Sequence, residues 1–270
     1  MNPKMINLLR KAAVEMTGVF ALNYFGGSSA YQVKEGMDTI NISYAHSFAI
    51  GVIIVIGLPI SGANFNPVVT VCGLLLGAET ILNASILILG QLLGSFLSAV
   101  AIKYSQPEAF VGKGLGYPKV PDGTTLEQAF FFETIGTFFL IFAIFAAVRA
   151  GYNHFVITLI VIAVLLFIIN SIGPLGELAM NPARTLGPAL LSDEGLFIRR
   201  WWIYYTASFL GGILGMLFAV FIIEVKPSEG DDTDYDDADE IHQRIKNQFK
   251  TINIKEDLDQ RNSSLQSQQQ

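Results

Sequence analysis

One short signature occurs twice in this sequence, as Asn66-Pro67-Val68 and as Asn181-Pro182-Ala183. Each copy follows a stretch long enough to span a bilayer and a Gly/Pro break, and each precedes an apolar run of helix length that is too short to span. Proline is favoured in the first turn of a helix, and the preceding asparagine can cap the free N–H groups. Both signatures therefore predict a half-helix that enters a membrane and stops midway.

The composition is typical of a polytopic membrane protein. Of the 270 residues, 51% are hydrophobic and 15% are charged, and the mean hydropathy is +0.47. These values disfavour a soluble enzyme, and no readable motif brings a nucleophile, a base and an orienting group together. Cys72 is the single cysteine, and the three histidines lie far apart in the sequence. We therefore expect no enzymatic activity, no metal site, no cofactor and no nucleic-acid partner.

Six apolar runs are long enough to cross a bilayer. They are residues 8–28, 45–58 with flanking residues, 81–102, 127–148, 155–172 and 201–223. We expect the first run to be a membrane helix and not a cleavable signal peptide, because it has full span length and carries Glu15. Since no charged residue lies between Asp38 and Glu79, the second span and the first half-helix share that segment.

An internal repeat relates the two halves of the chain. The pattern Glu15-x-x-Gly18-x-Phe20-x-Leu22 matches Glu133-x-x-Gly136-x-Phe138-x-Leu140 at an offset of 118, and the two Asn-Pro signatures are 115 residues apart. Three spans per unit is an odd number, so the second unit must be inverted in the membrane. The sequence thus predicts an all-α membrane protein, with six transmembrane helices and two half-helices arranged as an inverted repeat over about residues 8–104 and 126–223.

The negative charge lies in the C-terminal tail. Residues 1–223 carry 11 basic and 11 acidic side chains, whereas residues 224–270 carry 6 basic and 12 acidic ones. High charge with low hydrophobicity predicts disorder. We therefore divide the chain into a transmembrane channel domain, residues 1–225, and an acidic, disordered tail, residues 226–270. The tail is either a solvated extension or a regulatory segment.

Residues 61–70 (SGANFNPVVT) and 180–189 (MNPARTLGPA) resemble the two signature loops of the aquaporins. The resemblance covers about residues 8–223 and includes the paired Glu15 and Glu133 and also Gln91. It implies a homotetramer in the lipid bilayer with one pore per subunit. The termini would face the cytoplasm, and the membrane would be the plasma membrane or that of an intracellular vesicle or vacuole.

The resemblance also implies a mechanism. Asn66 and Asn181 would each present an amide donor to the lumen, so that one water oxygen accepts from both. The positive ends of the half-helices would face the same point and oppose the passage of protons and cations. We expect water and small neutral solutes to permeate the pore. The alternative is a scaffold or adhesion protein of the same fold that conducts little.

Arg184 lies in a stretch of sequence that is expected to be inside the membrane. Placing an arginine there costs about 2.5 to 3.5 kcal/mol of insertion free energy unless its side chain faces a polar lumen. By resemblance, it forms the narrowest ring of the pore with His46, Ile169 and Leu178. The pairing of His46 with Ile169 is similar to that of the vacuolar and ammonia-permeable branches of the family. It implies water as the permeant, with ammonia or urea as further candidates. The family resemblance as a whole adds glycerol to the small neutral solutes that are expected.

Two carboxylates and three departures from the family pattern complete the predictions. Glu15 and Glu133 lie in mid-span, where we expect them to accept N–H bonds from the irregular backbone ahead of each half-helix. Val68 replaces the usual alanine and either narrows the midpoint or repacks it. Asn64 stands where many relatives have histidine, and Glu177 stands where glycine is usual.

Overall fold

The computed structural model describes residues 3–29, 39–108, 114–118, 120–176, 178–192 and 201–223. These residues form helices joined by turns, and no strand occurs among them. The long helices are α1 (Pro3–Ala21), α2 (Thr39–Ser61), α4 (Ile81–Ser105), α6 (Leu126–Arg149), α7 (His154–Gly176) and α10 (Trp201–Ile222). The short helices are η1 (Leu22–Gly27), α3 (Pro67–Leu75) and α8 (Pro182–Leu191).

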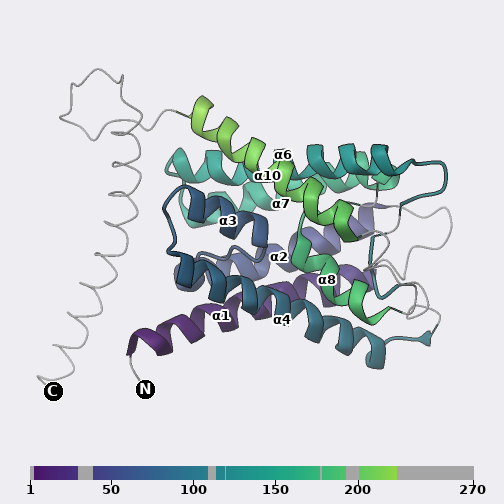
Figure 1. Cartoon of the computed structure of the whole chain (residues 1–270), viewed down its shortest axis with the longest axis horizontal. Helices are drawn as coiled ribbons and strands as arrows, with labels where there is room; N and C mark the ends of the chain where they lie inside the picture. Colours follow the sequence, from purple (N-terminus) through teal and green to yellow (C-terminus); the bar gives the residue numbers. More distant parts are fainter. Residues whose placement is uncertain are drawn as a thin grey trace, which may run out of the picture.

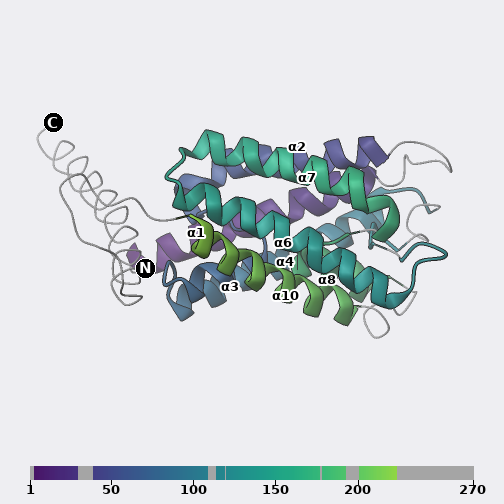
Figure 2. The same ribbon diagram turned by 90° about the horizontal axis from the view of Figure 1, so that it is seen from above.

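The long helices lie side by side in one bundle, with the start of α1 and the end of α10 at the same end (Figure 1). Helix α1 packs on α4 and α6 packs on α10, and these are equivalent pairs in the two repeats. Helices α2 and α7 pack on each other, as Figure 2 shows from above. The short helix α3 lies toward the end where α1 begins, and α8 lies toward the opposite end. The predicted inverted repeat is confirmed.

Five of the long helices are apolar and long enough to cross a membrane: Ile40–Ser61, Ile81–Ser105, Leu126–Arg149, His154–Gly176 and Trp201–Ile222. The first predicted span differs, because its α-helix ends at Ala21 and the chain continues as the π-helix η1. Helix α2 is also longer than the predicted run 45–58, since it continues through Pro59 to Ser61. Helix α7 has the equivalent proline, Pro174, in its last turn.

Glycines allow the two equivalent helix pairs to approach closely. A Cβ atom added at any of four glycines would overlap a backbone carbonyl oxygen of the facing helix. The facing pairs are Gly90 with Ala12, Gly94 with Met16, Gly211 with Thr134, and Gly215 with Phe138. Small residues at crossing points bring backbones close in membrane bundles, where lipid supplies no hydrophobic drive for association. The same crossing geometry therefore holds both halves of the bundle.

Candidate functional site

The two half-helices begin in the same way. Asn66 precedes α3 in extended conformation, and its side-chain oxygen accepts from the Val68 N–H at 2.9 Å. Asn181 caps α8 by accepting from Ala183 N–H at 3.0 Å and Arg184 N–H at 3.2 Å. In both cases the next residue is a proline in the first turn, where a missing N–H has no cost. The caps therefore fix which end of each amide faces its own helix.

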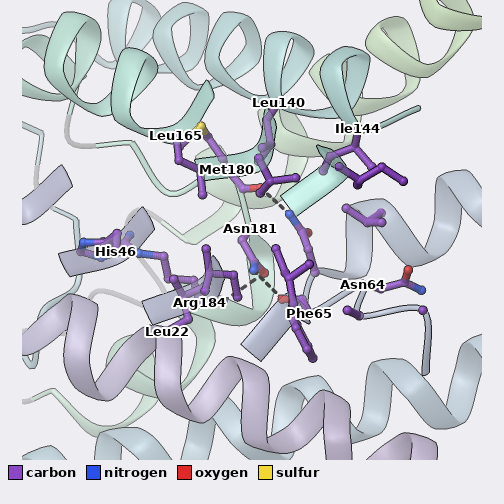
Figure 3. A pocket seen from close by; sticks show the side chains of 18 of the residues that line it. Leu22, His46, Asn64, Phe65, Leu140, Ile144, Leu165, Met180, Asn181 and Arg184 are labelled. Carbon is purple, nitrogen blue, oxygen red and sulfur yellow. Dashed lines mark hydrogen bonds between the residues drawn. The ribbon is translucent and has the colours of Figure 1, made fainter. Parts of the chain in front are cut away.

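Each capping asparagine donates to the backbone carbonyl of the residue that precedes the other asparagine. Asn66 Nδ2 donates to the carbonyl oxygen of Met180 at 2.7 Å, and Asn181 Nδ2 donates to that of Phe65 at 2.7 Å (Figure 3). Phe65 and Met180 have left-handed φ values of 49° and 54°, which are uncommon for residues other than glycine. This strained conformation directs each carbonyl toward the opposite amide. The N-termini of α3 and α8 thus meet at one point inside the bundle.

That meeting point faces a cavity of about 900 Å³. At the end of the bundle where α1 begins, the cavity is lined by Lys11, Glu79, Arg149 and His154. Its middle is lined by Asn66 and Asn181. The apolar side chains of Leu140, Ile144 and Leu165 line the cavity on the other side from Asn181 (Figure 3). Its other end is lined by His46, Arg184 and the turn at Gly116, Tyr117 and Pro118. The cavity therefore has a polar wall opposite an apolar one.

The four residues predicted to form a ring, His46, Ile169, Leu178 and Arg184, all line this cavity. Arg184 Nη2 lies 3.1 Å from His46 Nε2, and Arg184 Nη1 donates to the Leu178 carbonyl at 3.4 Å. Because a guanidinium can only donate, Nε2 of His46 must be the acceptor. The Nδ1–H of His46 then donates to the Ile42 carbonyl at 2.9 Å. This arrangement holds a neutral imidazole against Arg184.

Glu15 organises the backbone ahead of α3. Its two carboxylate oxygens accept from the backbone N–H groups of Asn64 and Phe65 at 3.0 and 2.6 Å. They also accept from the Ser61 hydroxyl and the Gln91 amide, each at 2.7 Å. Glu15 is fully buried, so these donors replace the water that a carboxylate would otherwise bind.

Glu133 has the equivalent place ahead of α8. It accepts from the backbone N–H groups of Ala179 at 2.8 Å and Met180 at 2.6 Å, and from the Ser208 hydroxyl. Each carboxylate thereby binds the residue with left-handed φ that directs its carbonyl to the opposite asparagine. The two carboxylates support the midpoint without facing it.

The remaining residues of the two signatures are buried away from the cavity. Pro67, Pro182 and Ala183 are buried, and Val68 is fully enclosed by a cluster that includes Ile141, Phe145 and Met216. Of the two alternatives for Val68, its burial therefore supports repacking. Asn64 lines the cavity and donates to the Thr70 hydroxyl at 3.2 Å. Glu177 and the acidic tail, residues 226–270, lie outside the described residues.

Two features of the site were not foreseen from the sequence. Gly26 of η1 lies directly against the imidazole of His46, where a Cβ would come within 2.7 Å of Cδ2. The turn at Gly116 lies against Gly27 and is held by Tyr204, whose hydroxyl donates to the Pro118 carbonyl at 3.2 Å. The sequences Gly26-Gly27 and Gly114-Leu115-Gly116 are weak signals of such close approaches, because glycines are frequent in membrane helices and turns.

Comparison with known proteins identifies the family of the chain. The family model described as major intrinsic protein matches residues 3–219. The chain is 34% identical to aquaporin NIP6-1 of Arabidopsis thaliana, over 79% of this chain and 68% of that protein, and 32% identical to nodulin-26 of Glycine max, over 78% and 76%. It is 33% identical to probable aquaporin-5 of Gibberella zeae, over 67% of this chain but 32% of that longer protein.

The fold is similar to the X-ray structure of the aquaglyceroporin from Plasmodium falciparum. The TM-score is 0.70 at 21% sequence identity, and the match covers 81% of this chain and 96% of that one. From the extent of the family match, we conclude that the chain belongs to the major intrinsic protein family, whose members are multi-pass membrane channels for water and small solutes and not enzymes.

Proposed function

We propose that this protein is a passive water channel that also admits small neutral solutes such as ammonia, urea or glycerol and excludes protons and ions. The observation that carries the proposal lies at the middle of the cavity, where Asn66 and Asn181 each donate to the backbone carbonyl of the residue that precedes the other. One N–H of each amide is used in these bonds. Among the described residues, the second N–H of each amide has no hydrogen-bond acceptor, and both side chains line the cavity.

The two free amide donors supply a mechanism for water passage. A water oxygen at the midpoint accepts from both asparagines, so its own hydrogens point outward along the file. The apolar wall at Leu140, Ile144 and Leu165 offers no competing partner, so that water leaves as readily as it enters. The positive ends of α3 and α8 meet at the same point and raise the energy of a proton or cation there.

Selectivity among neutral solutes is proposed to depend on the ring of His46, Ile169, Leu178 and Arg184. Arg184 provides donors, and its contact with His46 places two polar groups on one side of the passage. Ile169 and Leu178 line the same cavity and contribute apolar surface. A ring of this composition favours small solutes that accept hydrogen bonds and carry no charge.

We also propose that the protein is a homotetramer in a plasma, vesicle or vacuolar membrane, with both termini in the cytoplasm. Large hydrophobic side chains are exposed along the outer faces of the helices, for example Val52, Leu89 and Phe221. Such faces require lipid or neighbouring subunits.

Stopped-flow light scattering on proteoliposomes tests the proposal. An osmotic step with sucrose should cause fast shrinkage with a low activation energy, and parallel steps with glycerol, urea and an ammonium salt define the permeant solutes. Arg184→Val should admit larger solutes and raise proton leakage. The matched control is Lys103→Met, which removes a basic side chain outside the cavity lining. Shrinkage no faster than that of protein-free liposomes, with or without the tail, would support the scaffold alternative instead.

A further inference from the structure

Helix α7 carries a side-chain amide on a helix that is otherwise nearly apolar. The mean hydropathy of α7 is 3.0, the highest among the five candidate spans. Asn170 nevertheless lies within it, next to Ile169 of the proposed ring. An amide at membrane depth is costly unless its hydrogen-bonding groups are satisfied. Both N–H groups of Asn170 have an acceptor, and one of the two acceptors lies on a different helix.

Asn170 joins α7 to α2. Its Nδ2 donates to the Ser43 hydroxyl oxygen at 2.7 Å and to the carbonyl of Leu166, one turn earlier in its own helix, at 2.8 Å. Ser43 is fully buried, and its hydroxyl in turn donates to the Ile40 carbonyl at 2.7 Å. The bond to Leu166 fixes the rotamer of the amide, and the bond to Ser43 fixes the hydroxyl. The contact is therefore specific in direction and distance.

A second close contact joins the same two helices further along. Gly51 of α2 faces Ile162 of α7, and a Cβ at Gly51 would come within 2.5 Å of Ile162 Cδ1. This contact is eight residues from Ser43 on α2 and eight residues from Asn170 on α7. Equal spacing on two antiparallel helices means that both contacts belong to one register, about 12 Å apart along the axis.

Two residues of the proposed selectivity ring lie between these contacts in the sequence. His46 lies between Ser43 and Gly51 on α2, and Ile169 lies between Ile162 and Asn170 on α7. Without the Asn170–Ser43 bond, the contact at Gly51 would remain, and the two helices could diverge from that point toward the ring. The distance between the walls that carry His46 and Ile169 would then increase.

We propose that Asn170 and Ser43 form a clamp that fixes the separation of α2 and α7 at the level of His46 and Ile169, so that Asn170 is a positioning residue for solute selectivity. This inference rests on the proposed channel function. It requires neither residue to touch the solute, since the clamp acts through the two helices.

The test compares solute permeability with water permeability in proteoliposomes for Asn170→Leu, Ser43→Ala and the double variant. Each single substitution should raise the ratio of glycerol to water permeability roughly threefold, the factor that corresponds to loss of an average interhelical hydrogen bond. The double variant should equal the single ones, because all three lack the same contact. Thr206→Val is the matched control, since it removes a membrane-exposed hydroxyl that bonds only within its own helix among the described residues.

The outcomes separate the clamp from the channel function. Wild-type protein that gives no water permeability would overturn the proposed function itself. Wild-type protein that conducts, with an unchanged ratio in Ser43→Ala and Asn170→Leu, would overturn the clamp. Additive effects of the two substitutions would also overturn it, because independent sites do not share one contact. Ser43→Ala removes a single oxygen atom, so it remains informative if Asn170→Leu gives too little folded protein.

Discussion

Val68 and Gly212 occupy complementary space: one methyl group of Val68 fills the place where any residue but glycine at position 212 would put its Cβ. Val68 belongs to α3 and Gly212 to α10, so the pair joins a half-helix to the last long helix. The valine that departs from the family pattern is thus accommodated by the absence of a side chain opposite it, and Val68 does not line the cavity. Val68, in the place of the usual alanine, therefore packs inside the bundle against Gly212.

This complementarity predicts a coupled effect on stability. Gly212→Ala should destabilise the protein by about 1 to 3 kcal/mol through overpacking, and Val68→Ala by roughly 2 kcal/mol through loss of buried methyl groups. The double variant should be more stable than the sum of the two implies, because the new methyl group fills the vacated space. Thermal unfolding in detergent measures the three values.

Gly73→Ala is the control for this cycle, because a Cβ at Gly73 would meet no atom closer than the Ala78 Cβ at 4.0 Å. It should leave the unfolding temperature unchanged or slightly raised. Additive effects at positions 68 and 212 would show that the two residues do not share space.

The hydrogen bonds of Asn66 to the Met180 carbonyl and of Asn181 to the Phe65 carbonyl predict a second coupling. Replacement of either residue by alanine removes a helix cap and leaves the opposite carbonyl without its donor, at a total cost of about 2 kcal/mol or more. Because each asparagine bonds the residue that precedes the other, the second substitution should cost less than the first. Thr125→Ala is the control, because it removes the cap of α6, and among the described residues that cap bonds only within the same helix, for example to Gln128. Unfolding temperatures of the two single variants and the double variant decide between coupling and independence.

The half-helices could be predicted from sequence because their determinants are local. Asn-Pro specifies both the cap and the first turn, and its duplication with the paired Glu15 and Glu133 specifies the inverted arrangement. The ring residues were placed by the family resemblance, and the structure brings His46 and Arg184 into contact. These features depend on residue types at fixed spacing, which a sequence displays directly.

The supporting contacts could not be predicted in the same way. Asn170 and Ser43 are 127 residues apart and share no motif, so their pairing depends on the register of α2 against α7. The direction of Val68 also required the structure, because a residue at the start of a short helix can face either the lumen or the bundle. The change from α-helix to π-helix after Ala21 has no local signal in the residues that precede it.

The contacts of Glu133 predict that its role is structural. In Glu133→Gln, an amide N–H must face one of the backbone donors of Ala179 or Met180, and the loss of a charged acceptor costs about 1.5 to 3 kcal/mol. The yield of folded protein should fall while water flux per folded channel stays near the wild-type value. Glu127→Gln is the control on the same helix, because Glu127 is exposed at its first turn. Normal yield with reduced flux per channel would instead assign Glu133 a role in permeation.

The position of Gly26 against His46 predicts that alanine at Gly26 lowers water permeability, whereas alanine at the neighbouring Gly27 does not. A Cβ at Gly26 would lie 2.7 Å from His46 Cδ2, so Gly26→Ala must push the imidazole toward Arg184 and narrow the passage. A Cβ at Gly27 would meet its nearest atoms at 3.9 Å, so Gly27→Ala should be tolerated. Water permeability per channel should fall roughly fivefold in the first variant, as about 1 kcal/mol of overpacking implies, and remain unchanged in the second. Stopped-flow measurement on equal amounts of folded protein checks both values.

Adding His46→Ala to Gly26→Ala should restore water flux and admit larger solutes, because the displaced imidazole ring is then absent. If flux stays low in that double variant, the glycine acts on the fold of η1 and not through His46.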